Sequence, residues 1–409
     1  MISFRAKALK CGLELRSEVT VNGAAAGAQV STPTEVAALI VEFDPKSQPF
    51  VLISCDVIWF PSGMAKSLRQ AIAAMAGTSE AHVCLAASHT HGTPNPERNF
   101  QFPEWSIDLE EHISDKVLEV VQKTLEQPRT RATLNWGRGR LQGFAINRRR
   151  RALALRPRLA YRTQSLPNAK GTSDDTVDVM VLADSEDQRP LALVCRYTCH
   201  PVADSANQRG ADYPGYFREA IRSQLQADLP ILFVQGFCGD IRPNLQVRPL
   251  SLRDRLIQHV VGPRFRRSRA GDAQSIGQAL ANIIAQLFND SQLQPLHSDQ
   301  QSAELHTVNI DLDDNTQTNN RLELTVWDWS TVKLLFASGE MLSGLLPSRT
   351  NSCLCIGYAN GMVGYVPSEA DLKYGGYEID SSRQNFQLPA RISPASCRRI
   401  EGLIESLAR

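Results

Sequence analysis

Short apolar runs of the β-strand type alternate with helical patterns along most of this 409-residue chain. Runs such as 81–87 and 191–197 predict buried strands, while apolar residues at helical spacing over 107–125 predict a helix. The alternation favours an α/β fold, in which a mixed β-sheet core is layered with helices. The predicted strands are 37–43, 50–57, 81–87, 177–182, 191–197, 231–234, 303–310, 322–326 and 332–337, and the predicted helices are 65–75, 107–125, 216–225 and 275–287.

Charge and composition narrow the class of protein. The chain carries 44 Lys and Arg against 43 Asp and Glu, a net charge of +1, which argues against binding nucleic acid through overall charge. No run of about 18 apolar residues occurs, so no transmembrane helix is expected. Charges at Arg5, Lys7 and Lys10 interrupt any apolar run near the start, so no signal peptide is expected. Nine cysteines, an odd number, fit reduced thiols in the cytoplasm.

Two segments are strongly basic. No acidic residue lies between Glu126 and Asp174, and nine arginines occur between residues 138 and 162. A second basic stretch, 264–269, lies in a segment predicted to be a long loop. Solvated loops are one interpretation, and a face that binds phosphate, carboxylate or nucleic acid is the other. Neither segment has the interleaved aromatic residues of a single-strand binder, so no nucleic-acid partner is predicted.

Three histidines follow predicted strands. His89 and His91 come directly after 81–87, and His200 follows 191–197. The carboxyl ends of strands are where α/β sheets bind ligands. In an extended segment residues i and i+2 point to the same side, so both imidazoles of the first pair could face one ligand. They could bind one metal together, or one could bind it while the other donates a proton.

Other polar residues occupy similar positions along the chain. Asp212 and Asp240 are candidates for carboxylates that orient a metal-bound imidazole, with helix capping or turn formation as the alternative. Glu340 follows the predicted strand 332–337, where a capping role is again the alternative. Tyr365 and Tyr377 lie in glycine-containing segments and could equally be ordinary tyrosines at the edge of a core.

Taken in order, these motifs resemble the catalytic domain of the neutral, non-lysosomal ceramidases, which are zinc-dependent amidases. The resemblance covers roughly residues 54–378 and depends on the order of the motifs more than on any single one. The matching segments are Ser88–His91, Ile146–Arg148, His200, Gly239–Asn244, Gly339–Glu340, Tyr365–Glu369 and Tyr377–Glu378.

The resemblance implies a site and a mechanism. It implies that Zn²⁺ is bound by four residues, and that three others contact the substrate carbonyl or the tetrahedral intermediate. The implied ligands are His89, His200, Glu340 and Tyr365, and the implied substrate contacts are His91, Arg148 and Tyr377. Two imidazoles, a carboxylate and a phenol suit Zn²⁺, which activates water for attack on a carbonyl. We expect residues 1–409 to form one such hydrolase domain.

The chain also departs from this family. Arg242 stands where the family motif has serine, and neither a signal sequence nor a C-terminal β-sandwich is expected. We therefore predict a zinc-dependent hydrolase of amide (N-acyl) bonds that acts on a small-molecule or lipid-like substrate. Whether that substrate is ceramide stays open, because Arg242 and the arginines around Arg148 could favour a substrate with a carboxylate or phosphate. The alternatives are an esterase or lactam hydrolase with the same zinc site, and a non-catalytic anion-binding protein of the same fold.

Overall fold

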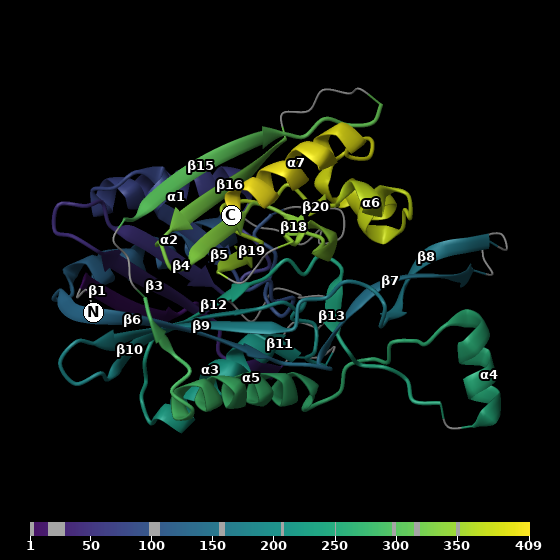
Figure 1. Ribbon diagram of the computed structural model, residues 1–409, viewed down its shortest axis with the longest axis horizontal. Helices are drawn as coiled ribbons and strands as arrows, with labels where there is room; N and C mark the ends of the chain where they lie inside the picture. Colours follow the sequence, from purple (N-terminus) through teal and green to yellow (C-terminus); the bar gives the residue numbers. More distant parts are fainter. Residues whose placement is uncertain are drawn as a thin grey trace.

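A computed structural model describes residues 4–14, 29–97, 107–154, 160–205, 208–249, 251–296, 300–314, 320–348 and 352–409. Its largest element is a nine-stranded sheet with the strand order β12-β10-β9-β6-β1-β3-β4-β5, and β14 pairs with β6 (Figure 1). The strands are β1 (Phe4–Gly12), β3 (Glu35–Glu42), β4 (Phe50–Cys55), β5 (Val83–Ala87), β6 (Thr130–Arg140), β9 (Thr176–Asp184), β10 (Pro190–Tyr197), β12 (Ile231–Gln235) and β14 (Gln294–Pro295).

The sheet is mixed, and its two ends lie close together. The pairs β10–β12 and β4–β5 are parallel, while the other pairs along the path are antiparallel. The Ser54 hydroxyl on β4 donates to the carbonyl of Phe233 on β12 at 2.6 Å, so the sheet curls back on itself. Segment 357–360 bridges the gap, because Gly357 N donates to Gln235 O at 2.9 Å and Ala87 N donates to Tyr358 O at 3.1 Å.

Helices cover one face of this sheet and a second sheet covers the other. Along β3, Ala38 and Ile40 pack in the core beneath α1 and α2, whereas Ala37 and Leu39 pack against the second sheet. This alternation follows from the two-residue period of a strand. A third core cluster joins β9, β10 and β12 to α3 and α5. The helices are α1 (Ser62–Ala76), α2 (Ile107–Glu126), α3 (Tyr213–Leu225) and α5 (Asp272–Asn289).

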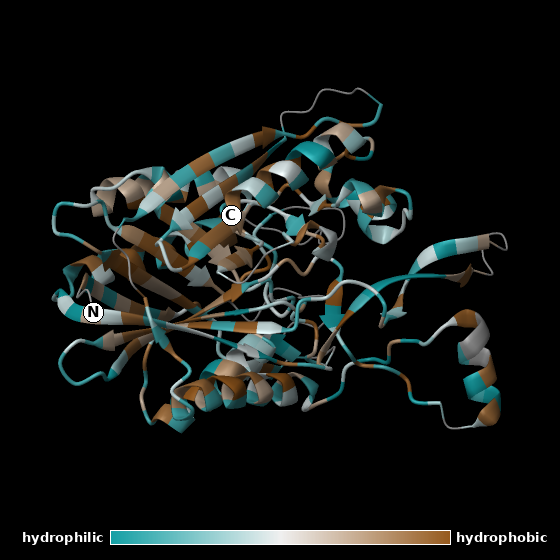
Figure 2. Cartoon of the chain, in the orientation of Figure 1, coloured by the Kyte–Doolittle hydropathy of each residue, from teal (hydrophilic) through white to brown (hydrophobic). Residues whose placement is uncertain are grey.

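The second sheet has four strands in the order β15-β16-β17-β19, and α7 (Pro394–Leu407) packs on its outer side (Figure 1). Trp327 and Phe336 face the large sheet, while Ile400 and Ile404 of α7 pack on the opposite side. Figure 2 shows hydrophobic residues concentrated along the strands between these layers. The strands are β15 (Ser302–Asn309), β16 (Arg321–Asp328), β17 (Lys333–Ala337) and β19 (Cys353–Ile356). The expected mixed sheet layered with helices is confirmed.

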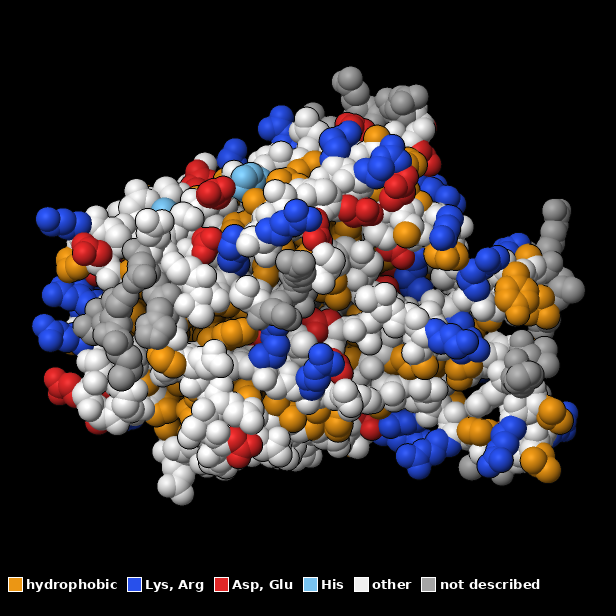
Figure 3. All heavy atoms as spheres, in the orientation of Figure 1, with side chains coloured by type: hydrophobic (Ala, Val, Ile, Leu, Met, Phe, Trp, Pro, Cys, Tyr) orange, Lys and Arg blue, Asp and Glu red, His pale blue; other side chains and the backbone are white. Residues whose placement is uncertain are grey.

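Part of the chain projects from this body. The hairpin of β7 (Ala145–Ala154) and β8 (Ala160–Asn168), which pairs with β13 (Ile241–Pro243), extends to one side together with α4 (Leu252–Val261) (Figure 1). Basic and hydrophobic side chains gather on this part in Figure 3. The remaining elements are β2 (Gln29–Thr32), β11 (Gln208–Gly210), β18 (Glu340–Met341), β20 (Tyr365–Val366), α6 (Glu369–Leu372) and short helical turns at 80–82, 343–345, 377–381 and 382–386.

Every strand and helix predicted from the apolar pattern is present, with bounds that differ by at most three residues. The interpretation of the first basic segment as loops is wrong, because β6, β7 and β8 occupy most of it. These strands lack the apolar alternation that identifies a strand in sequence. The second basic stretch does lie outside helices and strands, between α4 and α5. In the part of the chain that the structure describes, no helix is both long and apolar enough to span a bilayer.

Candidate active site

His89 follows β5 in a conformation that the sequence did not predict. Its φ is 62°, in the left-handed region, so the segment from His89 to His91 is not extended as expected. Such a φ is uncommon and costly for a residue other than glycine. The two imidazoles nevertheless lie together, with ring centroids 4.9 Å apart. The convergence therefore comes from a tight turn after β5 and not from the alternation of an extended strand.

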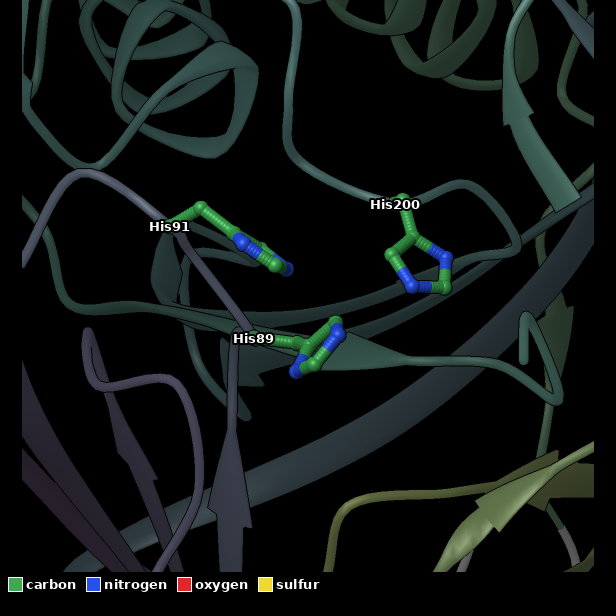
Figure 4. Close-up of side chains that lie close together, drawn as sticks. All are labelled: His89, His91 and His200. Carbon is green, nitrogen blue, oxygen red and sulfur yellow. The ribbon is translucent and has the colours of Figure 1, made fainter. Parts of the chain in front are cut away.

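Main-chain carbonyls orient two of the imidazoles. Nδ1 of His89 lies 2.8 Å from Ile58 O, and Nδ1 of His200 lies 2.9 Å from Ile241 O. Since a carbonyl only accepts, these contacts assign the proton to Nδ1 and leave the lone pair on Nε2. His91 completes the cluster, and one ring nitrogen from each histidine lies within 4.8 Å of the others (Figure 4). Three imidazoles at this spacing could bind one metal ion.

Glu340 on β18 faces the same point. Its Oε2 lies 3.6 Å from Nε2 of both His89 and His200. Parallel pairing of β18 with β20 places Tyr365 directly beside it. Nε2 of His89 is buried and has no hydrogen-bond partner among the described residues. A buried acceptor left in this state, beside a carboxylate and a phenol, fits a site for a metal ion.

The protonation states of the three histidines agree with metal binding. Burial lowers the pKa of His89 and His200 well below the usual range, and it lowers the pKa of His91 to about 3 with help from His200. All three imidazoles are therefore neutral at pH 7, which is the form that binds a metal. Burial raises the pKa of Glu340, and the neighbouring His89 opposes the rise.

Arg148 and Tyr377 lie next to this cluster. Arg148 on β7 donates to Glu378 at 2.7 Å, to the carbonyl of Gly239 at 2.9 Å and to the Tyr365 hydroxyl at 3.0 Å. Its guanidinium carbon lies 5.8 Å from the centre of the Tyr377 ring. The structure thus brings together the seven residues that the resemblance implied as metal ligands and substrate contacts.

Asp212 and Asp240 are placed differently. Asp212 caps α3 and accepts from the backbone of Ala203 and Asp204, each at 2.8 Å. Asp240 accepts from Asn147 at 2.7 Å and from the backbone of Ser343 at 2.8 Å. Burial raises the pKa of Asp212 to about 7 and that of Asp240 to about 6. In the described residues, carbonyls and not these carboxylates bond Nδ1 of His89 and His200. Asp212 caps a helix, and Asp240 links Asn147 to Ser343.

A cavity of about 390 Å³ opens beside the histidines. It combines aromatic walls with a few charged groups, an arrangement common in small-molecule sites, and its volume lies toward the small end of their usual range of about 300–1,000 Å³. The lining residues are Trp59, His91, Arg148, Ser165, His200, Val202, Arg242, Glu340, Tyr365, Tyr377 and Phe386.

Tyr358 is a site residue that the motif analysis missed. Its hydroxyl donates to Oε2 of Glu340 at 3.3 Å and accepts from Cys238 Sγ at 3.2 Å, while its ring stacks on His89 with centroids 3.9 Å apart. It lies just beyond the end of β19. The strand-end rule that identified the histidines could have identified it as well.

The layered arrangement of a curled mixed sheet, covering helices and a second sheet is similar to the fold of solved ceramidases. The whole chain aligns with 74% of neutral ceramidase from Pseudomonas aeruginosa at a TM-score of 0.76 and 14% identity. It likewise aligns with 75% of a ceramidase complexed with C2, at a TM-score of 0.75 and 13% identity. No protein-family model and no curated protein sequence matches the chain. The predicted resemblance is confirmed at the level of the fold.

Proposed function

We propose that this protein hydrolyses an amide (N-acyl) bond at a zinc site formed by His89, His200, Glu340 and Tyr365. The observation that carries the proposal is the position of Glu340 Oε2, 3.6 Å from Nε2 of both His89 and His200. These donors suit Zn²⁺, which when bound supplies an activated water and polarises a carbonyl. The proteins named as ceramidases that share the fold support an amide as the substrate.

Three residues would act on the substrate. His91, Arg148 and Tyr377 line the cavity and can donate hydrogen bonds to the oxygen that becomes negative during attack. Arg148 is fixed in advance, because Glu378 and the carbonyl of Gly239 hold its guanidinium. Such a donor needs no reorganisation when the charge develops.

His91 is the candidate that returns a proton to the leaving amine. It lines the cavity at the histidine cluster. Asp240 is another carboxyl group that could be considered for this step, but it lines a separate cavity with Asn147 and Ser343. Its position beyond the histidine cavity supports His91 in this role.

We infer that the catalytic unit comprises the whole chain and acts in the cytoplasm. Ligand positions spread from His89 to Tyr365 support one unit. All nine cysteines are free, which supports a reducing compartment.

An ester or lactam would be attacked by the same groups, so these substrates belong in the same assay.

Metal analysis and an amide-hydrolysis assay test the proposal. We expect one zinc per chain, hydrolysis of an N-acyl amine, and loss of both after dialysis against a chelator. His89→Ala and Glu340→Gln should lose zinc and activity, while the partly exposed His306→Ala should lose neither. Full activity in the zinc-free protein would reject the proposal that hydrolysis depends on zinc. Failure to cleave any amide, while an ester is cleaved, would favour the esterase alternative.

A further inference from the structure

Arg242 is a half-buried cation in the active-site cavity that no carboxylate of the described residues balances. It lines the cavity with His91 and His200, and its Nε is buried with no hydrogen-bond partner among the described residues. In the same set of residues it makes no ion pair. Its guanidinium lies 4.4 Å from the centre of the Phe265 ring, a contact that leaves its hydrogen-bond donors unused.

The neighbouring arginines are different. Arg148 pairs with Glu378 at 2.7 Å, and Arg149 pairs with Asp371 at 3.0 Å. Both therefore have their counter-charge within the chain. Glu340, the carboxylate among the residues that line the cavity, lies at the histidine cluster. Arg242 alone among the cavity arginines lacks a partner in the described part of the chain.

A half-buried cation with one buried donor unused is less favourable without a ligand than with one. A buried charge is normally paired, because removal from water costs free energy that only an opposite charge or hydrogen bonds recover. Burial and the charge of Arg148 both lower the pKa of Arg242, so the nearby positive charge adds to the cost. An arginine fork presents several N–H donors in a plane, which suits two oxygens of a carboxylate or phosphate.

We propose that Arg242 binds an oxyanion, a carboxylate or phosphate, carried by the amide substrate. The proposal rests on the proposed amide hydrolysis and specifies the substrate class. Ile241, the residue before Arg242, holds His200 through its carbonyl, so the guanidinium and the histidine cluster are tied to one short turn. We therefore expect the oxyanion of the substrate to lie within a few covalent bonds of the amide that is cleaved. A cavity of about 390 Å³ further selects a compact substrate.

Three probe amides with one acyl chain test this proposal. N-hexanoylglycine carries a carboxylate, N-hexanoyl-phosphoethanolamine carries a phosphate, and N-hexanoylethanolamine is uncharged. We expect kcat/KM to be at least about 10-fold higher for one anionic probe than for the neutral one, since hydrogen bonds to charged groups have this magnitude. The preferred probe distinguishes carboxylate from phosphate.

Variants assign the preference to Arg242. Arg242→Gln should lower the ratio of anionic to neutral kcat/KM by about 10- to 100-fold, mainly through KM. Arg242→Lys keeps the charge but not the fork, so it should retain part of the ratio. Arg267→Gln is the matched control, because Arg267 is exposed in the adjacent loop and does not line the cavity. Its ratio should equal that of the unchanged protein.

The outcomes separate this proposal from the amidase itself. Equal hydrolysis of anionic and neutral probes, with a ratio that Arg242→Gln leaves unchanged, would overturn the oxyanion site and keep the amidase. If no amide is hydrolysed, calorimetric titration of the same probes decides. Tighter binding of an anionic probe that Arg242→Gln abolishes would keep the oxyanion site and reject only the amidase. Equal binding of all three probes would reject both.

Discussion

Two polar clusters of this protein differ in whether their charged and polar groups find partners within the chain. Around Arg196 on β10, Nε donates to Asp178 at 2.7 Å, and another nitrogen donates to Asp174 at 2.8 Å. At the active site, Nε of the half-buried Arg242 and Nε2 of His89 are buried atoms without such partners among the described residues. The first cluster is complete within the chain, whereas the second is complete only with something bound. A satisfied network supports the fold, and unsatisfied groups indicate where a ligand belongs.

The largest effect is expected where the charges are fully paired. Asp178 is completely buried and accepts from both Arg138 and Arg196. Asp178→Asn should lower the free energy of unfolding by about 3–5 kcal/mol, because it leaves buried arginine charge uncompensated. Urea denaturation measures the loss. The control is Asp175→Asn, whose partner Arg140 is exposed at the surface and whose effect should stay below about 1 kcal/mol. Equal losses would remove the distinction between buried and surface pairs.

The active site should show the reverse pattern, a loss of rate without a loss of stability. Tyr377→Phe removes one hydroxyl from the cavity, and kcat should fall by about 10²–10³, as for other donors to a developing oxyanion. The urea midpoint should not move. Tyr374→Phe, on the partly exposed Tyr374 of the separate cavity, should keep full kcat. A shifted midpoint with an unchanged kcat would assign Tyr377 to the fold instead.

A smaller effect on stability is expected from Asp174, a carboxyl group of the Arg196 cluster. Burial alone would raise the pKa of Asp174, but Arg196 and Thr176 lower it to about 2. A carboxyl with a depressed folded-state pKa stabilises the protein above its unfolded pKa, and this stability is lost as the pH falls toward 2. The contribution is about 2 kcal/mol.

Unfolding free energies measured between pH 5 and pH 2 test this contribution. The unchanged protein and Asp174→Asn should differ at pH 5 and converge toward pH 2. The exposed Asp187→Asn should follow the unchanged protein throughout. A constant difference between the unchanged protein and Asp174→Asn at every pH would contradict the lowered pKa.

The smallest effect concerns a neutral contact between the two ends of the sheet. Ser54→Ala removes the bond to Phe233 O and should cost about 1 kcal/mol, the usual net value for one hydrogen bond. Ser47→Ala, which removes a bond to Asp44 O at the surface, should cost less. A cost near that of Asp178→Asn would show that closure of the sheet depends on this one contact.

The sequence predicted the individual strands and helices better than it predicted how the large sheet closes. Apolar runs identified β5 and β10, and strand ends identified His89 and His200, because both features are local. β7 contains a run of arginines and has no apolar alternation, so its sequence does not indicate a strand. Tyr358 joins the site only because segment 357–360 bridges β12 and β5. That bridge depends on long-range pairing, which the local pattern of a single sequence does not contain. The left-handed turn at His89 is likewise imposed by tertiary contacts.

The closure of the sheet also bears on how the chain folds. His89, His200 and Glu340 are each separated by more than one hundred residues, and they meet only when the two ends of the sheet have met. Contacts between such distant segments form slowly, because a long loop must close before they contribute stability. We therefore expect the histidine cluster to form late in folding. A chain stalled before that stage would have correct strands and helices but no active site.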